Sequence, residues 1–116
     1  MVDDEAALAE IFLQALQNVG YQVSSYTDSS QALQGFMEKP DHFDILIADI
    51  NMPQMDGIKL ASEILKIRSI PIILYTGFLD HNLQRKAETI GVTHILNKPI
   101  LPDEMVRAVA KAIYEG

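Results

Sequence analysis

Apolar residues recur along this chain in two patterns that take turns. Five stretches place them three and four positions apart, which is the spacing of a helix that buries one face. Between these stretches lie three short runs rich in apolar residues, as expected for strands covered on both sides, and one stretch with strand-like alternation. The helical stretches are 8–19, 28–37, 57–69, 80–90 and 102–113, and the strand-like stretches are 21–26, 44–48, 70–76 and 93–96.

Residues at the ends of the helical stretches support these boundaries. Gly20 and Gly91 follow the first and fourth helical stretches, and a glycine just past the last turn commonly ends a helix. A side chain able to cap a helix stands at or just before the start of the second and fourth stretches, namely Thr27 or Asp28 and Asp80. The helices are therefore defined by their ends as well as by their apolar faces.

The order of these elements predicts the fold class. Strands that alternate with helices form βα units, which build a doubly wound α/β fold with a parallel sheet between two layers of helices. A length of 116 residues is enough for one domain with its own core. We therefore predict a single domain over residues 1–116. In such sheets a ligand binds beyond the carboxyl ends of the strands, where the strand order reverses.

The first strand is the element for which the sequence leaves least room. Only Met1 and Val2 precede Asp3, whereas a strand typically has ~5 residues. A sheet that lacked this strand would expose unpaired backbone edges. Three expectations stay open: the native chain begins before Met1, the first strand is truncated, or a second protomer supplies the strand in a homodimer.

Composition and charge exclude several functions. The net charge of -7 provides no basic face for nucleic acid, and the absence of cysteine excludes disulfides and thiolate metal sites. No apolar run approaches the ~20 residues that span a bilayer. No signal-peptide pattern opens the chain. We expect a cytoplasmic domain that binds neither nucleic acid nor membrane.

Polar residues gather at the predicted carboxyl ends of the strands. Asp49, Thr76 and Lys98 each close or follow a strand-like stretch. Asp3 and Asp4 stand where the first strand should end, just before the first helix. Each has an ordinary structural role when taken alone, as a cap, a turn residue or a solvated charge. Their shared position at one edge of the sheet instead indicates a site.

This set of side chains suits a divalent cation and a phosphoryl group. Clustered carboxylates repel one another, so they ionise together when a cation joins them. Oxygen ligands without His or Cys favour a hard ion, Mg²⁺ or Mn²⁺, and the Asp49–Asn51 stretch lacks the glycine and glutamate of a calcium loop. Cation and ammonium would neutralise phosphoryl oxygens, a hydroxyl would donate to them, and a carboxylate would attack phosphorus.

Four motifs, in order, resemble those of response-regulator receiver domains of two-component signalling. They are VDDE (2–5), ADINMPQMDG (48–57), LYTG (74–77) and NKP (97–99), and the match covers nearly the whole chain. The resemblance implies the flavodoxin-like fold of chemotaxis-type regulators, with five helices and five strands in the order 2-1-3-4-5. It also implies a phosphorelay switch with at most slow autodephosphorylation, not a turnover enzyme.

The resemblance assigns roles to the acidic residues. Asp49 would accept the phosphoryl group from a phosphohistidine on a sensor histidine kinase or a histidine phosphotransfer protein. Asp4 and Asp49 would hold Mg²⁺ together with the backbone carbonyl of Asn51. Asp3 would act on the ion through water.

Further roles follow for the loops around the acids. Thr76 would turn its hydroxyl onto the phosphoryl group, and Lys98 would reach both that group and the nucleophile. The bond before Pro99 would be cis, which an X-Pro bond permits at modest cost. Gly77 would leave room above the site. The remaining loop-shaping residues are Pro53, Asp56 and Gly57. Phosphorylation would then shift the surface formed by the fourth helix, fifth strand and fifth helix.

The sequence departs from the family pattern in one place and carries two positions that tune phosphoryl lifetime. The position three before the lysine usually holds an aromatic residue and here is Ile95, so coupling between threonine and an aromatic side chain is not expected. Asn51 and Phe78 occupy the lifetime-tuning positions. A bulky Phe78 is expected to shield a phosphoaspartate from water and to slow its hydrolysis.

Two other functions stay open as alternatives. A pseudo-receiver would bind a partner without being phosphorylated, which the complete set of acids, threonine and lysine argues against. A magnesium-dependent phosphohydrolase would use an aspartyl-phosphate, but such enzymes usually carry a second acid two positions after the nucleophile, where this chain has Asn51. The cognate kinase, the signal and the downstream effector are not specified by these residues.

Overall fold

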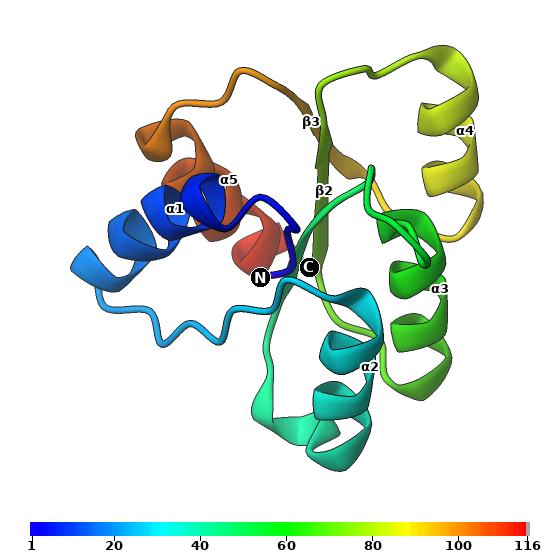
Figure 1. The fold of residues 1–116 in the computed structure, drawn as a ribbon, viewed down its shortest axis with the longest axis horizontal. Helices are drawn as coiled ribbons and strands as arrows, with labels where there is room; N and C mark the ends of the chain where they lie inside the picture. Colours follow the sequence, from blue (N-terminus) through cyan, green and yellow to red (C-terminus); the bar gives the residue numbers. More distant parts are fainter. Residues whose placement is uncertain (116) are drawn as a thin grey trace.

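A three-stranded parallel sheet lies between two layers of helices in the structure, a computed structural model that describes residues 1–115 (Figure 1). The strands are β1 (Leu46–Asp49), β2 (Ile72–Thr76) and β3 (His94–Asn97), hydrogen-bonded in the order β1-β2-β3. Parallel pairing puts the carboxyl ends of all three strands at one edge. The βα pattern of the sequence is thereby confirmed.

The helices divide between the two faces of the sheet. Helices α1 and α5 pack against each other on one face, and α2, α3 and α4 lie on the other (Figure 1). A short 3-10 helix, η1, precedes β1. The bounds are α1 (Ala6–Asn18), α2 (Ser29–Glu38), η1 (Pro40–His42), α3 (Gly57–Ile67), α4 (His81–Thr89) and α5 (Pro102–Glu115). All five helical stretches of the sequence form helices.

Alternation along the strands separates the core into two clusters. Leu46, Ala48 and Leu74 face α2, α3 and α4, whereas Ile47 and Tyr75 face α1 and α5. This follows from the two-residue period of a strand, which sends successive side chains to opposite faces. Every residue of β1 and β2 is buried, which explains why these strands read as continuous apolar runs.

The predicted helix ends are confirmed at four positions. Asp28 accepts hydrogen bonds from the backbone N–H of the second and third residues of its helix, at 2.7 and 3.3 Å. Asp80 accepts one at 2.8 Å at the start of α4. Gly20 and Gly91 have φ angles of 102° and 98°. These lie in the left-handed region, which a glycine just after the last turn of a helix adopts without a steric cost.

The strand predicted over 21–26 does not form, and this expectation was wrong. Only Tyr26 pairs with a neighbour, through an isolated parallel bridge to Val2. Val2 in turn bridges Ala48 of β1. The first strand is therefore reduced to one bridging residue, which leaves the 21–26 segment with almost no backbone to pair with. The order Tyr26, Val2, β1, β2, β3 still matches the predicted 2-1-3-4-5 order.

Within residues 1–115, none of the helices combines the length and apolar character needed to cross a membrane.

Candidate functional site

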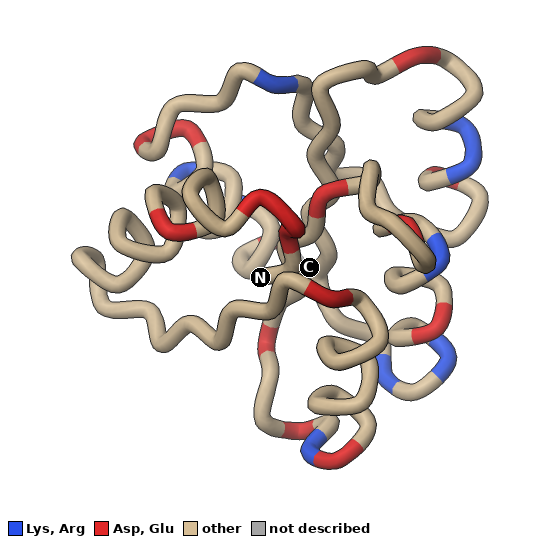
Figure 2. The backbone as a smooth tube through the Cα atoms, in the orientation of Figure 1, with Lys and Arg blue, Asp and Glu red and all other residues tan. Residues whose placement is uncertain are grey.

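Three carboxylates meet at the carboxyl edge of the sheet. Asp49 is the last residue of β1, and the backbone pairing of Val2 places Asp3 and Asp4 beside it. One oxygen from each of the three acids lies within 4.8 Å of the others. Asp3 and Asp49 are buried and Asp4 is exposed, so the cluster opens to solvent on one side only. Figure 2 shows acidic residues at the point where the N-terminal segment meets β1.

The donor chemistry of this cluster fits Mg²⁺. All three side chains offer carboxylate oxygens, which are the ligands that hard divalent cations prefer. Burial raises the pKa of Asp3 above its ordinary value, hydrogen bonds from Tyr75 and Glu5 act in the opposite direction, and the nearby charge of Asp49 raises it further. A cation would relieve this cost by offsetting the negative charge. Asp3, Asp4 and Asp49 would therefore hold it, and receiver domains bind Mg²⁺ at such an acidic pocket.

Lys98 supplies a positive charge beside Asp49. It follows β3, and its Nζ lies 3.1 Å from Oδ2 of Asp49 and 3.5 Å from Oε1 of Glu5. Burial acts against the ammonium charge, yet the hydrogen bond to Asp49 and the nearby acids outweigh it and raise the pKa of Lys98. The lysine therefore stays charged at neutral pH. The Lys98–Pro99 peptide bond is cis.

Thr76 and Asn51 connect the ends of β1 and β2. The Asn51 amide Nδ2 donates to Thr76 Oγ1 at 2.7 Å, and the backbone N–H of Phe78 donates to the same oxygen at 3.1 Å. The backbone N–H of Asn51 donates to Oδ1 of Asp49 at 3.1 Å. The fully buried threonine hydroxyl is thus held two hydrogen bonds away from the carboxylate. The Asn51–Thr76 hydrogen bond joins residues 25 positions apart, so no local sequence pattern predicts it.

The loop after β1 is shaped by close packing at Gly57. A Cβ atom added at Gly57 would lie 2.3 Å from the Asp49 backbone oxygen, a distance that no side chain tolerates. Asp56 caps α3 by accepting from the backbone N–H of Lys59 at 2.8 Å. Gln54, next to Pro53, has a φ of 69°, a left-handed turn conformation uncommon outside glycine. Helix α3 therefore begins directly against the backbone that carries Asp49.

The remaining predicted residues lie around the opening of the site. A Cβ at Gly77 would approach only the Lys98 side chain, at 3.9 Å, so this position has ordinary packing room. Phe78 is 80% exposed, so in this conformation its ring does not cover the acids. Ile95 lies in β3, opposite Leu74 in the register, and packs against the α2–α4 side of the core. Ile95 is therefore a partly buried residue at the border of the core.

Sequence reasoning missed one residue of the site, Tyr75. It was assigned only to a buried strand, but its hydroxyl donates to Oδ2 of Asp3 at 2.5 Å. Burial raises the pKa of Tyr75 far above its ordinary value, and the hydrogen bond to Asp3 and the charges of the neighbouring acids raise it further. The phenol therefore remains neutral. The one available signal was a hydroxyl-bearing aromatic at the end of an otherwise aliphatic strand.

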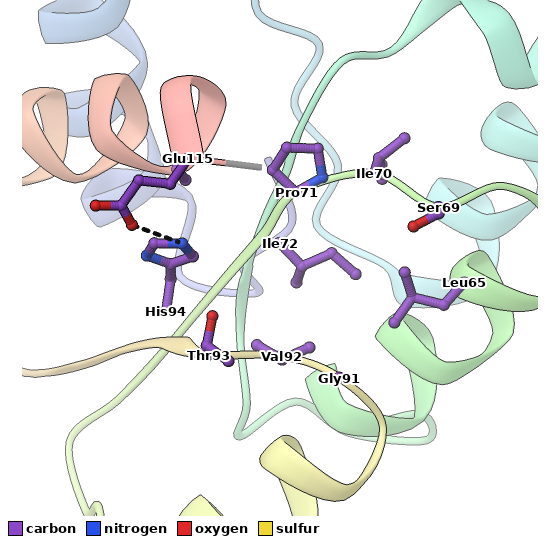
Figure 3. Close-up of a pocket in the computed structure, with 11 residues that line it drawn as sticks. Leu65, Ser69, Ile70, Pro71, Ile72, Gly91, Val92, Thr93, His94 and Glu115 are labelled. Carbon is purple, nitrogen blue, oxygen red and sulfur yellow. Dashed lines mark ion pairs between the residues drawn. The ribbon is translucent and has the colours of Figure 1, made fainter.

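A cavity of about 290 Å³ lies elsewhere, at the opposite edge of the sheet (Figure 3). It is lined by the starts of β2 and β3, including Ile72 and His94, and by the end of α5. His94 and Glu115 face each other across it at 3.9 Å. None of the predicted site residues lines it, and it lies at the amino ends of the strands. We therefore place the candidate site at the acids and not in this cavity.

The same fold occurs in known receiver domains. The crystal structure of a response regulator receiver domain protein from Clostridium thermocellum has a TM-score of 0.90 at 28% identity, covering 98% of this chain and 91% of that chain. The Vibrio cholerae chemotaxis protein CheY4 has a TM-score of 0.88 at 25% identity, covering 96% and 93%. The fold and the acidic edge therefore define a flavodoxin-like signalling domain.

Sequence comparison gives the family. The response regulator receiver domain profile matches residues 1–110, and this chain belongs to that family. It is 34% identical over 113 residues to the C4-dicarboxylate transport transcriptional regulatory protein DctD of Rhizobium meliloti (strain 1021), covering 97% of this chain and 24% of DctD. It is 28% identical to the response regulator receiver protein CpdR of Brucella abortus (strain 2308), covering 97% and 93%. Among three similar relatives the chain spans only 24% to 48% of their length.

Proposed function

We propose that this chain is a phosphoacceptor switch in which Asp49 takes a phosphoryl group from a phosphohistidine. The donor would be a sensor histidine kinase or a histidine phosphotransfer protein, the class of partner with which receiver domains interact. The observation that carries the proposal is the ion pair between Asp49 and Lys98, at 3.1 Å, next to two further carboxylates. An ammonium fixed on a carboxylate inside an acidic pocket suits the addition of a second anion at that carboxylate.

The transfer would proceed by direct displacement at phosphorus. A carboxylate oxygen of Asp49 forms the new bond to phosphorus, the bond from phosphorus to the imidazole nitrogen breaks, and the electron pair of that bond stays on the imidazole. Lys98 balances charge on the phosphoryl oxygens as it leaves its contact with free Asp49. A bound Mg²⁺ would supply charge neutralisation and orientation of the same oxygens. The Asn51 carbonyl as a ligand stays a prediction.

The response to phosphorylation would begin at Thr76. A phosphoryl group on Asp49 offers new acceptor oxygens, so Thr76 would exchange its contact with Asn51 for a hydrogen bond to that group. The loop after β2 would follow, because Phe78 donates to the same hydroxyl. Since this loop leads into α4, the α4–β3–α5 surface would shift. The bulky Phe78 could then close over the phosphoryl group and slow hydrolysis.

Intact-mass measurement tests the proposal. The protein is incubated with Mg²⁺ and a small phosphoryl donor such as acetyl phosphate, alongside Asp49→Asn and the matched control Asp44→Asn, an exposed acid outside the site. We expect one phosphate adduct in the wild type and in the control, and none in Asp49→Asn. An unmodified wild type would favour a pseudo-receiver. Continuous turnover of donor at a rate above the decay of the adduct would favour a phosphohydrolase.

A further inference from the structure

We infer that Tyr75 is a positioning residue of the phosphoryl-transfer site, which sets the orientation of the cation-binding carboxylate Asp3 and supports Lys98. Tyr75 lies opposite Asp49 in the register of β1 and β2, so both side chains leave the sheet on the same face. Its hydroxyl reaches Asp3, and its ring lies under the Lys98 ammonium at 5.3 Å. One buried side chain thus contacts both a carboxylate and the ammonium group of the site. The inference rests on the proposed function where it concerns phosphoryl transfer.

The hydroxyl fixes Asp3 in one orientation. Oδ2 of Asp3 accepts from Tyr75 at 2.5 Å, while Oδ1 accepts from the backbone N–H of Glu5 at 2.8 Å. Each carboxylate oxygen has a further lone pair, so both remain able to face a cation or its water. Hydrogen-bond partners of this kind fix the orientation of metal ligands. Without the hydroxyl, Asp3 would keep one partner and could rotate away from Asp49.

The aromatic ring is itself held in place. Tyr75 is fully buried and makes an edge-on contact with Phe12 of α1, with ring centroids 5.8 Å apart. A buried phenol needs a hydrogen-bond partner, and among residues 1–115 the recorded acceptor of its proton is Asp3. A leucine or valine would fill this strand position without that demand. The choice of tyrosine therefore points to the hydroxyl as the functional part.

Two substitutions separate the hydroxyl from the ring. Tyr75→Phe removes the contact to Asp3 and keeps the ring below Lys98. Tyr75→Leu removes both contacts. We therefore expect Tyr75→Phe to weaken cation binding alone. We expect Tyr75→Leu to weaken cation binding and also to slow phosphoryl transfer when Mg²⁺ is saturating.

The first measurement is Mg²⁺ binding by isothermal titration calorimetry, without any phosphoryl donor. We expect Tyr75→Phe to weaken binding by about tenfold, as loss of an outer-shell partner commonly does. The control Tyr21→Phe, remote from the acids, should bind as the wild type does. In the Asp3→Asn background, Tyr75→Phe should cause no additional loss, because Tyr75 acts through Asp3. Wild-type affinity in Tyr75→Phe, or an equal loss in both backgrounds, would overturn the inference.

The second measurement uses the wild-type protein, so its result does not depend on whether the Tyr75 variants fold. With ¹³C-labelled tyrosine, the Tyr75 ring signal should shift during the Mg²⁺ titration with the same midpoint as calorimetry, while the Tyr21 signal stays fixed. A silent Tyr75 signal would contradict the inference. A further outcome is that Mg²⁺ binding shows the expected dependence on Tyr75 and Asp3 and yet the wild type forms no adduct with the donor. In that case the proposed function fails and the positioning role of Tyr75 stands.

Discussion

The two flanks of β1 differ sharply in how much backbone holds them. Towards β2 and β3, parallel ladders of four residue pairs each join the three strands. On the other side, only Val2 lies between β1 and Tyr26, and it pairs with each through one isolated bridge. Yet both flanks deliver residues to the same site, since Asp49 and Lys98 come from the ladder side and Asp3 and Asp4 from the bridge side.

This difference shows how little regular structure an acidic site requires. Four backbone hydrogen bonds of 2.8 to 3.0 Å around the first three residues are enough to bring Asp3 beside Asp49. Strand ends matter for the site, whereas the length of the strand behind each end matters for stability. We therefore expect substitutions in the strand interiors of the ladder side, away from the strand ends, to change unfolding alone, and substitutions on the bridge side to change cation binding as well.

The largest expected effect is on the ladder side. Leu74→Ala removes a fully buried side chain from β2 and should lower the free energy of unfolding by about 2–5 kcal/mol, measured by urea denaturation. Mg²⁺ affinity of the folded fraction should stay unchanged, because Leu74 faces away from the acids. A loss of affinity larger than the loss of folded protein explains would break the distinction between the flanks.

A smaller loss of stability is expected on the bridge side. Val2→Ala removes about two methylene equivalents from a buried site and should cost about 1.6 kcal/mol. Unlike Leu74→Ala, it should also weaken Mg²⁺ binding, because Val2 positions the neighbouring Asp3. Calorimetry on both variants at equal folded fraction makes the comparison. Equal Mg²⁺ affinities for the two variants would refute it.

Loss of the hydrogen bond from Asn51 to Thr76, which joins the ends of β1 and β2, should lower stability by a still smaller amount. Asn51→Ala removes the amide donor to Thr76 and should lower the free energy of unfolding by about 1 kcal/mol. The freed threonine should turn more readily, so ¹³C relaxation of its methyl group should show greater motion than in the wild type. Unchanged methyl motion would mean that the Phe78 N–H alone holds the hydroxyl.

The last prediction concerns a substitution that should raise the free energy of unfolding. The pKa of Asp3 is raised by burial, so the folded state binds its proton more tightly than the unfolded state does. The stabilisation that protonated Asp3 contributes to the folded state is fully present below its ordinary pKa of 3.8. It is lost as the pH rises through the higher pKa of Asp3 in the folded state. Without divalent cations, Asp3→Asn should therefore be more stable than the wild type at pH 7, and the difference should vanish towards pH 3. A less stable variant at pH 7 would contradict this.

The sequence predicted most of the fold because local signals and the core agreed. Asp28, Asp80, Gly20 and Gly91 mark helix ends through their own backbone contacts, which are local and readable. The segment 21–26 was misassigned because strand-like alternation forms a strand only where a partner runs beside it. The few residues before Asp3 left three explanations open for the first strand, and the structure shows a single bridging residue there.

The candidate site was predictable in composition but not in its connections. Strand ends of a parallel sheet meet at one edge, so the meeting of Asp49 with Asp3 and Lys98 followed from topology. The contacts of Tyr75 with Asp3, and of Asn51 with Thr76, depend on side-chain reach between segments distant in the sequence. No periodicity encodes such contacts, and only coordinates reveal them.

The side chains of the last two residues of β2 point towards different helix layers. Tyr75 belongs to the face covered by α1 and α5, and the strand period turns Thr76 to the face covered by α3 and α4. Any new charge beside Asp49 would be felt by both at once. A change at this one carboxylate would therefore act on residues of both helix layers.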